Sequence, residues 1–300
     1  MSNTFHTTLR RVLRNVGQRL PGLRRLSGRL GLGRLLSAGS TQEQIIIDED
    51  IVIELDLSVP IFRYIYFHHN LSEAVETKLI RRLANPTDSY VDVGAHIGYF
   101  ALVAAKYAGR THAFEPSAKT FTYLRRNLDL NPMLARKIFA HQIGLGSAPA
   151  TLKLYRPASH PGTASLQPVS APDTIIETIE VDTLDNCIGA EKVHFIKADV
   201  EGGELDVFRG AQGIIERDRP CILCEMFEPH ANRFGYTCGD LMAFFVQRRY
   251  QGFLAGDQPK HSSKITLANL DLQMLSKTEA NNALFIPVEK KDSILARLTS

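Results

Sequence analysis

The sequence predicts an α/β fold built on a doubly wound, mostly parallel sheet with helices on both faces. Short β-branched runs alternate with amphipathic stretches between residues 72 and 250, which is the pattern of repeated strand–helix units. Such units place their strands in parallel with right-handed crossovers. Two strand-like runs at 151–155 and 175–181 have no helix between them, so they predict an inserted β-hairpin. With 300 residues and 44% hydrophobic content, the chain can bury a full core.

The elements are predicted in order from hydrophobic periodicity and end signals. Residues 45–66 predict short strands and a lead-in segment, and residues 72–84 predict a helix with Ser72 as its N-cap. The strands expected after them cover 90–94, 110–115, 138–143, 193–199, 221–226 and 282–287, and the helices cover 98–107, 117–130, 203–216 and 239–249.

The N-terminal segment 1–42 differs from the rest of the chain in charge. Residues 1–40 hold eight arginines and no acidic residue; because the whole chain carries +3, residues 41–300 carry −5. Leu9 and Leu13 lie one helical turn apart between these arginines. Three interpretations fit this composition: a flexible tail, peripheral attachment to an anionic membrane, and a mitochondrial-type transit peptide.

Residues 43–300 are expected to form a single domain. Its core is predicted at 72–250, preceded by the lead-in segment 43–71 and followed by a C-terminal strand region, 251–300. The sequence contains no window of 18 apolar residues, so we predict no transmembrane span. Four cysteines are too few for a disulfide framework in a chain of this length, which favours a reducing, cytoplasmic setting.

The stretch SYVDVGAHIGYF, residues 89–100, is a predicted strand that carries a carboxylate and then breaks into a helix. Gly94 and Gly98 permit positive φ, and they let the backbone approach a ligand beside the free N–H groups of a helix N-terminus. The loop G-A-H-I-G lacks the central glycine with which a dinucleotide site accommodates pyrophosphate. Asp92, inside the strand, favours a cation over a phosphate. The stretch therefore indicates a ligand with an adenosine group and no diphosphate.

The next predicted strand ends in a second acidic residue, Glu115. It lies 21 residues after Gly94, a distance at which an acidic side chain accepts ribose hydroxyls in doubly wound folds. Together with Asp92, this predicts S-adenosylmethionine, whose amino and sulfonium groups are cationic. The residues expected to bind it are Asp92, Gly94, Ala95, His96, Gly98, Phe100, Glu115, Pro116, Gly144 and Asp199.

Six short motifs lie between Tyr90 and Glu225. They are VDVGAHIGYF, AFEP, NLDLN, VDTLD, FIKADVEGGELDVFRGA and CILCE. In these motifs the chain resembles the FkbM family of S-adenosylmethionine-dependent methyltransferases. The resemblance implies a class I methyltransferase fold and methylation of a hydroxyl on a sugar or polyketide. Gly203 departs from the family, which more often has alanine there.

The D-V-E-G motif supplies candidate catalytic groups. A hydroxyl becomes a better nucleophile when a base takes its proton, and Asp199, Glu201 and His230 are the candidates for that base. Asp199 or Glu201 binding a divalent cation is the alternative, but two carboxylates are only part of a six-fold oxygen site, so no metal ligand is assigned. Cys221 and Cys224 point to opposite faces of a predicted strand, so we interpret them as core residues.

Lys197 falls in the middle of a predicted strand, where an unpaired ammonium is costly to bury. Glu225 on the next strand is the first candidate for its partner, and Asp199 and Asp92 are the alternatives. The segment PGTASLQP, residues 161–168, belongs to the predicted insertion. It is expected either to bend over the cofactor or to form an ordinary surface loop.

These observations predict an S-adenosylmethionine-dependent O-methyltransferase whose acceptor is a small molecule or glycan: a sugar, glycolipid or secondary metabolite with a hydroxyl. One alternative is a methyltransferase of protein or nucleic acid on the same fold. Two carboxylates after the fourth strand suit a phosphate backbone badly, so no nucleic acid is expected. The other alternative is a non-catalytic adenosine-binding module. Residues 1–40 are the expected contact with an anionic membrane, which would leave the protein cytoplasmic and peripheral.

Overall fold

A computed structural model describes residues 41–68, 75–158, 161–257, 265–275 and 280–299. The chain divides into two compact units, one ending at Glu73 and the other running from Ala74 to Ser300. The basic segment 1–40 and the predicted N-cap Ser72 lie outside the described residues, so the predictions made for them stay predictions. Within the described ranges, no helix has both the length and the apolar character needed to cross a membrane.

In its described residues, 41–68, the first unit forms an antiparallel hairpin followed by one helix. Strands β1 (Gln42–Ile47) and β2 (Ile51–Asp56) pair along their whole length, and alternate side chains of each strand are buried. Helix α4 (Pro60–His68) follows, although the sequence predicted only strands and a lead-in segment here. The helix is explained by Pro60, which suits a first helical position, and by Phe62 and Tyr66, which are buried one turn apart.

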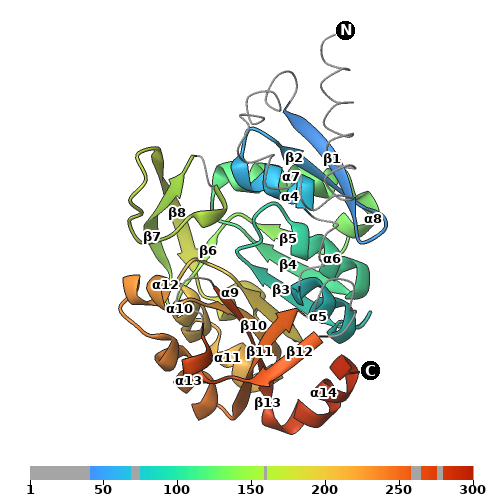
Figure 1. Ribbon diagram of the computed structural model, residues 1–300, viewed down its shortest axis with the longest axis vertical. Coiled ribbons are helices and arrows are strands. Elements are labelled where there is room, and N and C mark those ends of the chain that lie inside the picture. Colours follow the sequence, from blue (N-terminus) through green and yellow to red (C-terminus); the bar gives the residue numbers. More distant parts are fainter. Residues whose placement is uncertain (1–40, 69–74, 159–160, 258–264, 276–279, 300) are drawn as a thin grey trace, which may run out of the picture. The chain divides into compact units, whose positions relative to one another are not determined.

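The second unit is built on an eight-stranded sheet that confirms the doubly wound prediction (Figure 1). Its strands in spatial order are β5 (Ile138–His141), β4 (Arg110–Phe114), β3 (Ser89–Val93), β9 (Phe195–Ala198), β10 (Cys221–Met226), β13 (Asn281–Pro287), β11 (Tyr250–Asp257) and β12 (Ile265–Asn269). The first five are mutually parallel. Strand β13 runs antiparallel between β10 and β11, and β12 is antiparallel to β11. Since the chain leaves β3 to form β4 on one side and returns to β9 on the other, the order reverses beside β3.

Helices cover both faces of this sheet. On one face, α6 (Tyr99–Tyr107) contacts β3, β4 and β5, and α5 (Val75–Leu83) packs on α6 and on α14 (Lys291–Thr299). On the other face, five helices share one apolar cluster with β9 and β10. They are α9 (Leu184–Ile188), α10 (Glu204–Arg209), α11 (Gln212–Asp218), α12 (Glu228–Arg233) and α13 (Cys238–Gln247). The remaining helical elements are α7 (Ala118–Asp129), α8 (Pro132–Ala135), η2 (Pro161–Thr163), η3 (Leu272–Met274) and η4 (Val288–Lys290).

The helix predicted over residues 203–216 is two helices, α10 and α11. The chain breaks at Gly210, which lies against the backbone of Gly146: a Cβ at this glycine would stand 2.0 Å from the Gly146 carbonyl oxygen. A close tertiary contact therefore decides the break, and local helix propensity does not.

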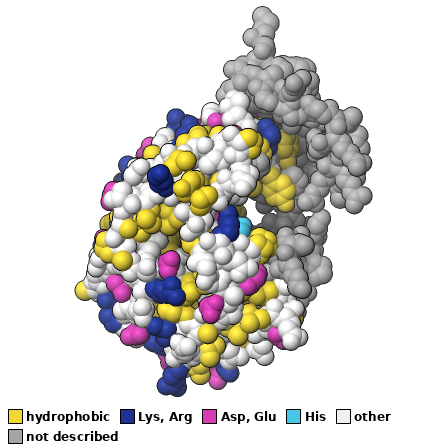
Figure 2. Space-filling view, turned by 90° about the vertical axis from the view of Figure 1, so that its left-hand side faces the viewer, with side chains coloured by type: hydrophobic (Ala, Val, Ile, Leu, Met, Phe, Trp, Pro, Cys, Tyr) yellow, Lys and Arg dark blue, Asp and Glu magenta, His cyan; other side chains and the backbone are white. Residues whose placement is uncertain are grey.

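The predicted insertion forms its own three-stranded sheet. Strands β7 (Ala150–Pro157) and β8 (Thr174–Asp182) are the antiparallel hairpin that the sequence predicts, and the short β6 (Gly144–Leu145) pairs with β8. Leu154 and Ile179 belong to a buried apolar cluster on one side of this sheet. Figure 2 views the side of the unit that carries the hairpin, where hydrophobic side chains and charges of both signs share the surface.

Candidate active site

The turn between β3 and α6 is held at the carboxyl end of the sheet by backbone hydrogen bonds. The N–H groups of Gly94 and Ala95 both donate to the carbonyl oxygen of Phe114, at 3.0 and 2.9 Å. Gly94 and Gly98 have φ angles of +78° and +83°, which glycine adopts without steric cost. The two glycines of the motif therefore do what the sequence predicts: they turn the chain out of β3 and into α6.

The same turn lies directly against the end of β9. The N–H of Asp199 donates to the carbonyl oxygen of Val93 at 3.1 Å. A Cβ at position 94 would stand 2.0 Å from the Asp199 carbonyl oxygen, so only glycine fits. The turn after Asp199 is closed by buried Glu204, which accepts from the N–H groups of Val200 and Gly202 at 3.0 and 3.3 Å. These contacts fix the Asp199 backbone beside the glycine turn.

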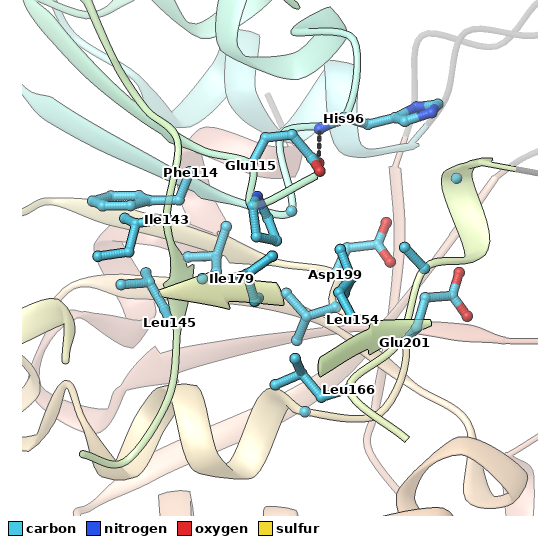
Figure 3. A pocket seen from close by; sticks show the side chains of 18 residues that line it. His96, Phe114, Glu115, Ile143, Leu145, Leu154, Leu166, Ile179, Asp199 and Glu201 are labelled. Carbon is cyan, nitrogen blue, oxygen red and sulfur yellow. Dashed lines mark hydrogen bonds between the residues drawn. The ribbon is translucent and has the colours of Figure 1, made fainter. Parts of the chain in front are cut away.

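A pocket opens where β3, β4 and β9 end, with about 680 Å³ of empty space including its mouth (Figure 3). Phe114, Ile143 and Leu145 make one end of it apolar, whereas the carboxylates of Asp199 and Glu201 stand at the opposite end. Leu154, Leu166 and Ile179 close the space between them, and Glu115 lies between the two ends as well. The pocket thus changes from apolar to acidic along its length.

Glu115 is the buried carboxyl at the middle of this pocket. Its Oε2 accepts from the N–H of His96 at 3.0 Å, and its Oε1 accepts from the N–H of Ser117 at 2.9 Å. Burial raises its pKa to about 8, although both hydrogen bonds act in the opposite direction. The side chain is therefore held in one orientation by the glycine turn and by the start of α7.

Six of the ten predicted cofactor-binding residues line the pocket, and four do not. Those in the lining are Gly94, His96, Glu115, Pro116, Gly144 and Asp199. Ala95 and Gly98 shape the turn behind it, where the Gly98 N–H donates to the Ala95 carbonyl at 2.8 Å. Asp92 is fully buried, and the Phe100 ring centroid lies 4.8 Å from the Lys197 ammonium. The binding role of all ten residues stays a prediction.

Lys197 pairs with Asp92 and Asp199, so the expectation that Glu225 would be its first partner is wrong. The distances from its Nζ are 3.7 Å to Asp92 and 3.4 Å to Asp199. Strand register gives the reason: Lys197 lies beside Asp92 on β3 and Leu223 on β10, so Glu225 stands two residues further along. Burial alone lowers the pKa of Lys197, but the two carboxylates outweigh burial and raise it. The side chain remains an ammonium.

Glu225 instead lies beside His230, at the start of α12. The His230 Nδ1 is hydrogen bonded to Glu225 Oε2 at 3.3 Å, and Glu201 Oε2 is 3.2 Å from the same nitrogen. His230 does not line the pocket itself, but it contacts Glu201, which does. The three side chains are close enough to surround one cation, since their ligand atoms lie within 4.8 Å of one another. Because the hydrogen bond occupies Nδ1, we assign no metal ligand.

The segment 161–168 lies over the pocket and is not an ordinary surface loop. Gly162 and Leu166 contribute to the pocket lining. Ser165 is buried and donates its hydroxyl to the carbonyl oxygen of Glu201 at 3.3 Å. The loop from the hairpin is therefore fastened to the turn that carries the candidate catalytic carboxylates.

The apolar wall contributed by the hairpin was not predicted. Leu154 and Ile179 reach the pocket from β7 and β8, and Glu177 joins β8 to the start of α7. Its carboxylate accepts from Ser117 Oγ at 3.1 Å and from Arg156 Nε at 2.7 Å. The alternation within residues 175–181 was a signal for a buried side of this strand. No local feature of the sequence showed that this side faces the pocket.

The stability of the ligand-free protein is expected to fall between pH 7 and pH 9. Burial raises the pKa of Glu115 to about 8 and that of Glu201 to about 9. Both keep a proton at pH 7 when folded, whereas both have lost it in the unfolded chain. Because the folded state holds a proton that the unfolded chain does not, each rise of one pH unit lowers the free energy of unfolding by up to about 1.4 kcal/mol for each group, until the pH passes the folded pKa of that group. Between pH 7 and pH 9, the melting temperature of Glu201→Gln should fall less than that of the wild type. An equal fall in both proteins would contradict this prediction.

The sequence profile described as the methyltransferase FkbM domain matches residues 92–254, more than half of the chain. The chain belongs to the FkbM methyltransferase family. The match runs from Asp92 in β3 to Leu254 in β11, so it includes the glycine turn, Glu115, the D-V-E-G turn and His230. The residues that build the pocket are thus part of the family domain.

Two curated relatives share parts of this FkbM chain. "Methyltransferase 1" of Beauveria bassiana is 34% identical over 149 residues, which is 42% of this chain and 59% of that protein. "Hexuronic acid methyltransferase AglP" of Haloferax volcanii is 28% identical over 139 residues, 46% of this chain and 56% of that protein. The matches thus span less than two thirds of either relative. A crystal structure of methyltransferase FkbM from Methylobacillus flagellatus superposes with a TM-score of 0.46 at 18% identity, covering 76% of this chain and 53% of that one.

Proposed function

We propose that this protein is an S-adenosylmethionine-dependent O-methyltransferase that acts on a hydroxyl of a sugar, glycolipid or secondary metabolite. The observation that carries the proposal is the order of groups along the pocket. An apolar end is followed by the buried carboxyl of Glu115 and then by the carboxylates of Asp199 and Glu201. Membership of the FkbM family supports the same reaction class.

The residues present fit S-adenosylmethionine. The apolar end, with Phe114 and Leu145, suits an adenine ring, and the Glu115 carboxylate suits ribose hydroxyls as an acceptor. Asp199, at the opposite end, suits the positive amino and sulfonium groups. Gly94 lets the turn after β3 lie directly against the Asp199 backbone, because any Cβ at position 94 would collide with it. When bound, the cofactor supplies a methyl group activated by its positive sulfur.

The protein must hold an acceptor hydroxyl at the acidic end and take its proton. Asp199 is suitably exposed there, with a side chain that is 44% accessible and anchored at one oxygen by Lys197. Glu201 lines the same end, and His230 stands directly behind Glu201. These three are the base candidates, as the sequence predicts, and each is within one side chain of the pocket.

A sugar acceptor is supported by the relative from Haloferax volcanii, whose name specifies hexuronic acid methylation. The other relatives include "Methyltransferase sdnD" of Sordaria araneosa, 31% identical over 40% of this chain and 59% of that protein. We therefore propose a hydroxylated small molecule or glycan as the acceptor class. Residues of the hairpin and of the segment 161–168 would form one wall of its binding site.

The first test is calorimetric titration of the full chain with S-adenosylmethionine and with its demethylated product, S-adenosylhomocysteine. We expect both to bind at one site per chain. Methyl-labelled cofactor is then incubated with the protein and a panel of acceptors: neutral hexosides, hexuronic acids, a hydroxylated polyketide, bulk RNA and casein.

The outcomes separate the competing functions. Label on a hydroxyl of a glycoside or polyketide is the expected result. Label on RNA or casein would overturn the acceptor class, and cofactor binding without transfer to any acceptor would favour an adenosine-binding module. Absence of cofactor binding by folded protein would overturn the proposal as a whole.

A further inference from the structure

We propose that His230 is the general base of the methyl transfer and that Glu225 is its positioning residue, which sets the imidazole tautomer and orientation. This inference rests on the proposed function, and it selects one base among three candidates. Glu225 has no assigned role in catalysis, and the sequence suggested only an ion pair with Lys197 for it.

The His230 ring is fixed on one side. Its Nδ1 is hydrogen bonded to Glu225 Oε2 at 3.3 Å, and the ring meets Phe227 edge to face, with 4.7 Å between centroids. Glu225 lies on β10, whose backbone is paired on both sides by β9 and β13. A carboxylate accepts only, so the neutral imidazole must carry its proton on Nδ1. Its Nε2 then presents a lone pair.

The second ring nitrogen is not engaged by another side chain of the described residues. Among the residues that the structure describes, Nε2 of His230 has no hydrogen-bond partner, and the side chain is 25% exposed. The carboxyl groups of Asp199 and Glu201, the other base candidates, each contact a neighbouring nitrogen. Asp199 is paired with Lys197 at 3.4 Å, so one of its oxygens already contacts a cation.

Glu201 is the weaker partner of His230, although it lies equally near. Its Oε2 is 3.2 Å from Nδ1, but this contact is an ion-pair distance without hydrogen-bond geometry. Burial, together with the neighbouring Asp199 and Glu225, raises the pKa of Glu201 to about 9. Glu201 therefore holds a proton at neutral pH, which leaves Glu225 as the acceptor for the imidazole N–H.

The protein backbone keeps His230 beside the pocket. A Cβ at Gly202 would stand 2.6 Å from the His230 carbonyl oxygen, so the D-V-E-G turn packs directly on the start of α12. Arg233, one turn further along α12, donates to the carbonyl oxygen of Glu201 at 3.1 Å. The turn that lines the pocket and the helix that carries the imidazole thus form one packed structure.

In the proposed step, the acceptor O–H gives its proton to Nε2 of His230. The oxygen electron pair forms the new bond to the methyl carbon, and the carbon–sulfur bond breaks with its electron pair on sulfur. The imidazolium formed carries a positive charge beside Glu225, which stabilises it. The proton later leaves to solvent, since the ring is partly exposed.

The tautomer is tested on the full chain labelled with ¹⁵N in its ten histidine rings. The signals of His230 are identified by their loss in His230→Asn. Long-range ¹H–¹⁵N correlation should show the neutral ring protonated on Nδ1. In Glu225→Leu, which removes the acceptor, the proton should move to Nε2; in the matched variant Glu201→Leu it should stay on Nδ1.

Three results would overturn the inference. One is a wild-type ring protonated on Nε2, and another is a tautomer that changes equally in Glu201→Leu and Glu225→Leu. The third is selective broadening of the His230 signals by added Mn²⁺, which would assign these side chains to a metal ion. These three measurements are made without the cofactor. A failure of this inference can therefore be distinguished from a failure of the wild type to bind the cofactor.

The kinetic test uses the acceptor that the labelling panel identifies. His230→Asn should lower kcat at least about 100-fold, the usual contribution of a general base, with cofactor affinity within about threefold of wild type. Glu225→Leu should lower kcat about 10-fold and alter the pH profile, whereas Glu225→Gln, whose amide oxygen still accepts Nδ1–H, should lose less. Wild-type kcat in His230→Asn would overturn the assignment.

Discussion

Glu115→Ala is expected to weaken binding of S-adenosylmethionine at least about 100-fold. The side chain is buried, and its two oxygens already accept backbone N–H groups at 3.0 and 2.9 Å, so it is oriented before any ligand arrives. Each hydrogen bond to a charged acceptor contributes about 1.5–3 kcal/mol, and two ribose hydroxyls can share this carboxylate once it has lost the proton that the ligand-free protein holds up to about pH 8, so the titration is made at pH 9. A loss of about 2.7 kcal/mol corresponds to the expected change in Kd.

Calorimetry of the variant needs two controls, because Ala also leaves the N–H groups of His96 and Ser117 without their acceptor. Thermal unfolding first establishes that Glu115→Ala is folded at the titration temperature. Glu180→Ala, which removes an exposed carboxylate from the same pocket-forming hairpin, should bind the cofactor like wild type. Binding by folded Glu115→Ala within about threefold of wild type would refute the assigned ribose contact.

Six strands of the sheet were predicted from short apolar runs with a turn signal at their ends, whereas β11 and β12 were not predicted as strands. Strand β10 begins and ends where the sequence predicts, at Cys221 and Met226. Helix α12 was missed, since six residues with a proline give little periodicity. The break between α10 and α11 was missed for another reason: the Gly146 carbonyl that forces it comes from a part of the chain more than sixty residues away.

The position of the pocket was predictable where a glycine turn and an acidic residue follow the ends of two adjacent strands. Gly94 and Glu115 were found in this way, because spacing along two adjacent parallel strands is also spacing in the fold. The ion-pair partners of Lys197 could not be predicted, because they depend on the register of β9 against β3 and β10. The contact between Glu225 and His230 was also invisible, since it requires the chain to reverse from a strand into α12 within five residues.

Gly94→Ala is expected to lower the free energy of unfolding by at least about 3 kcal/mol and to abolish cofactor binding. The residue has a φ of +78°, which costs an L-residue about 1–2 kcal/mol. The added methyl would also stand 2.0 Å from the Asp199 carbonyl oxygen, a backbone atom that cannot turn aside as a side chain can. At roughly 2–4 °C per kcal/mol for a domain of this size, thermal unfolding should begin about 6–12 °C lower.

Gly235→Ala separates the two causes, because Gly235 has nearly the same φ, +76°, and no heavy atom within 4 Å of a Cβ built there. Its free energy of unfolding should fall only by the cost of a positive φ for an L-residue, about 1–2 kcal/mol, and it should bind the cofactor normally. Equal losses in both variants would mean that positive φ alone makes position 94 a glycine. A larger loss at position 94, together with loss of binding, would show that the close approach of β3 and β9 selects glycine. In that case the same contact positions Asp199 at the end of the pocket.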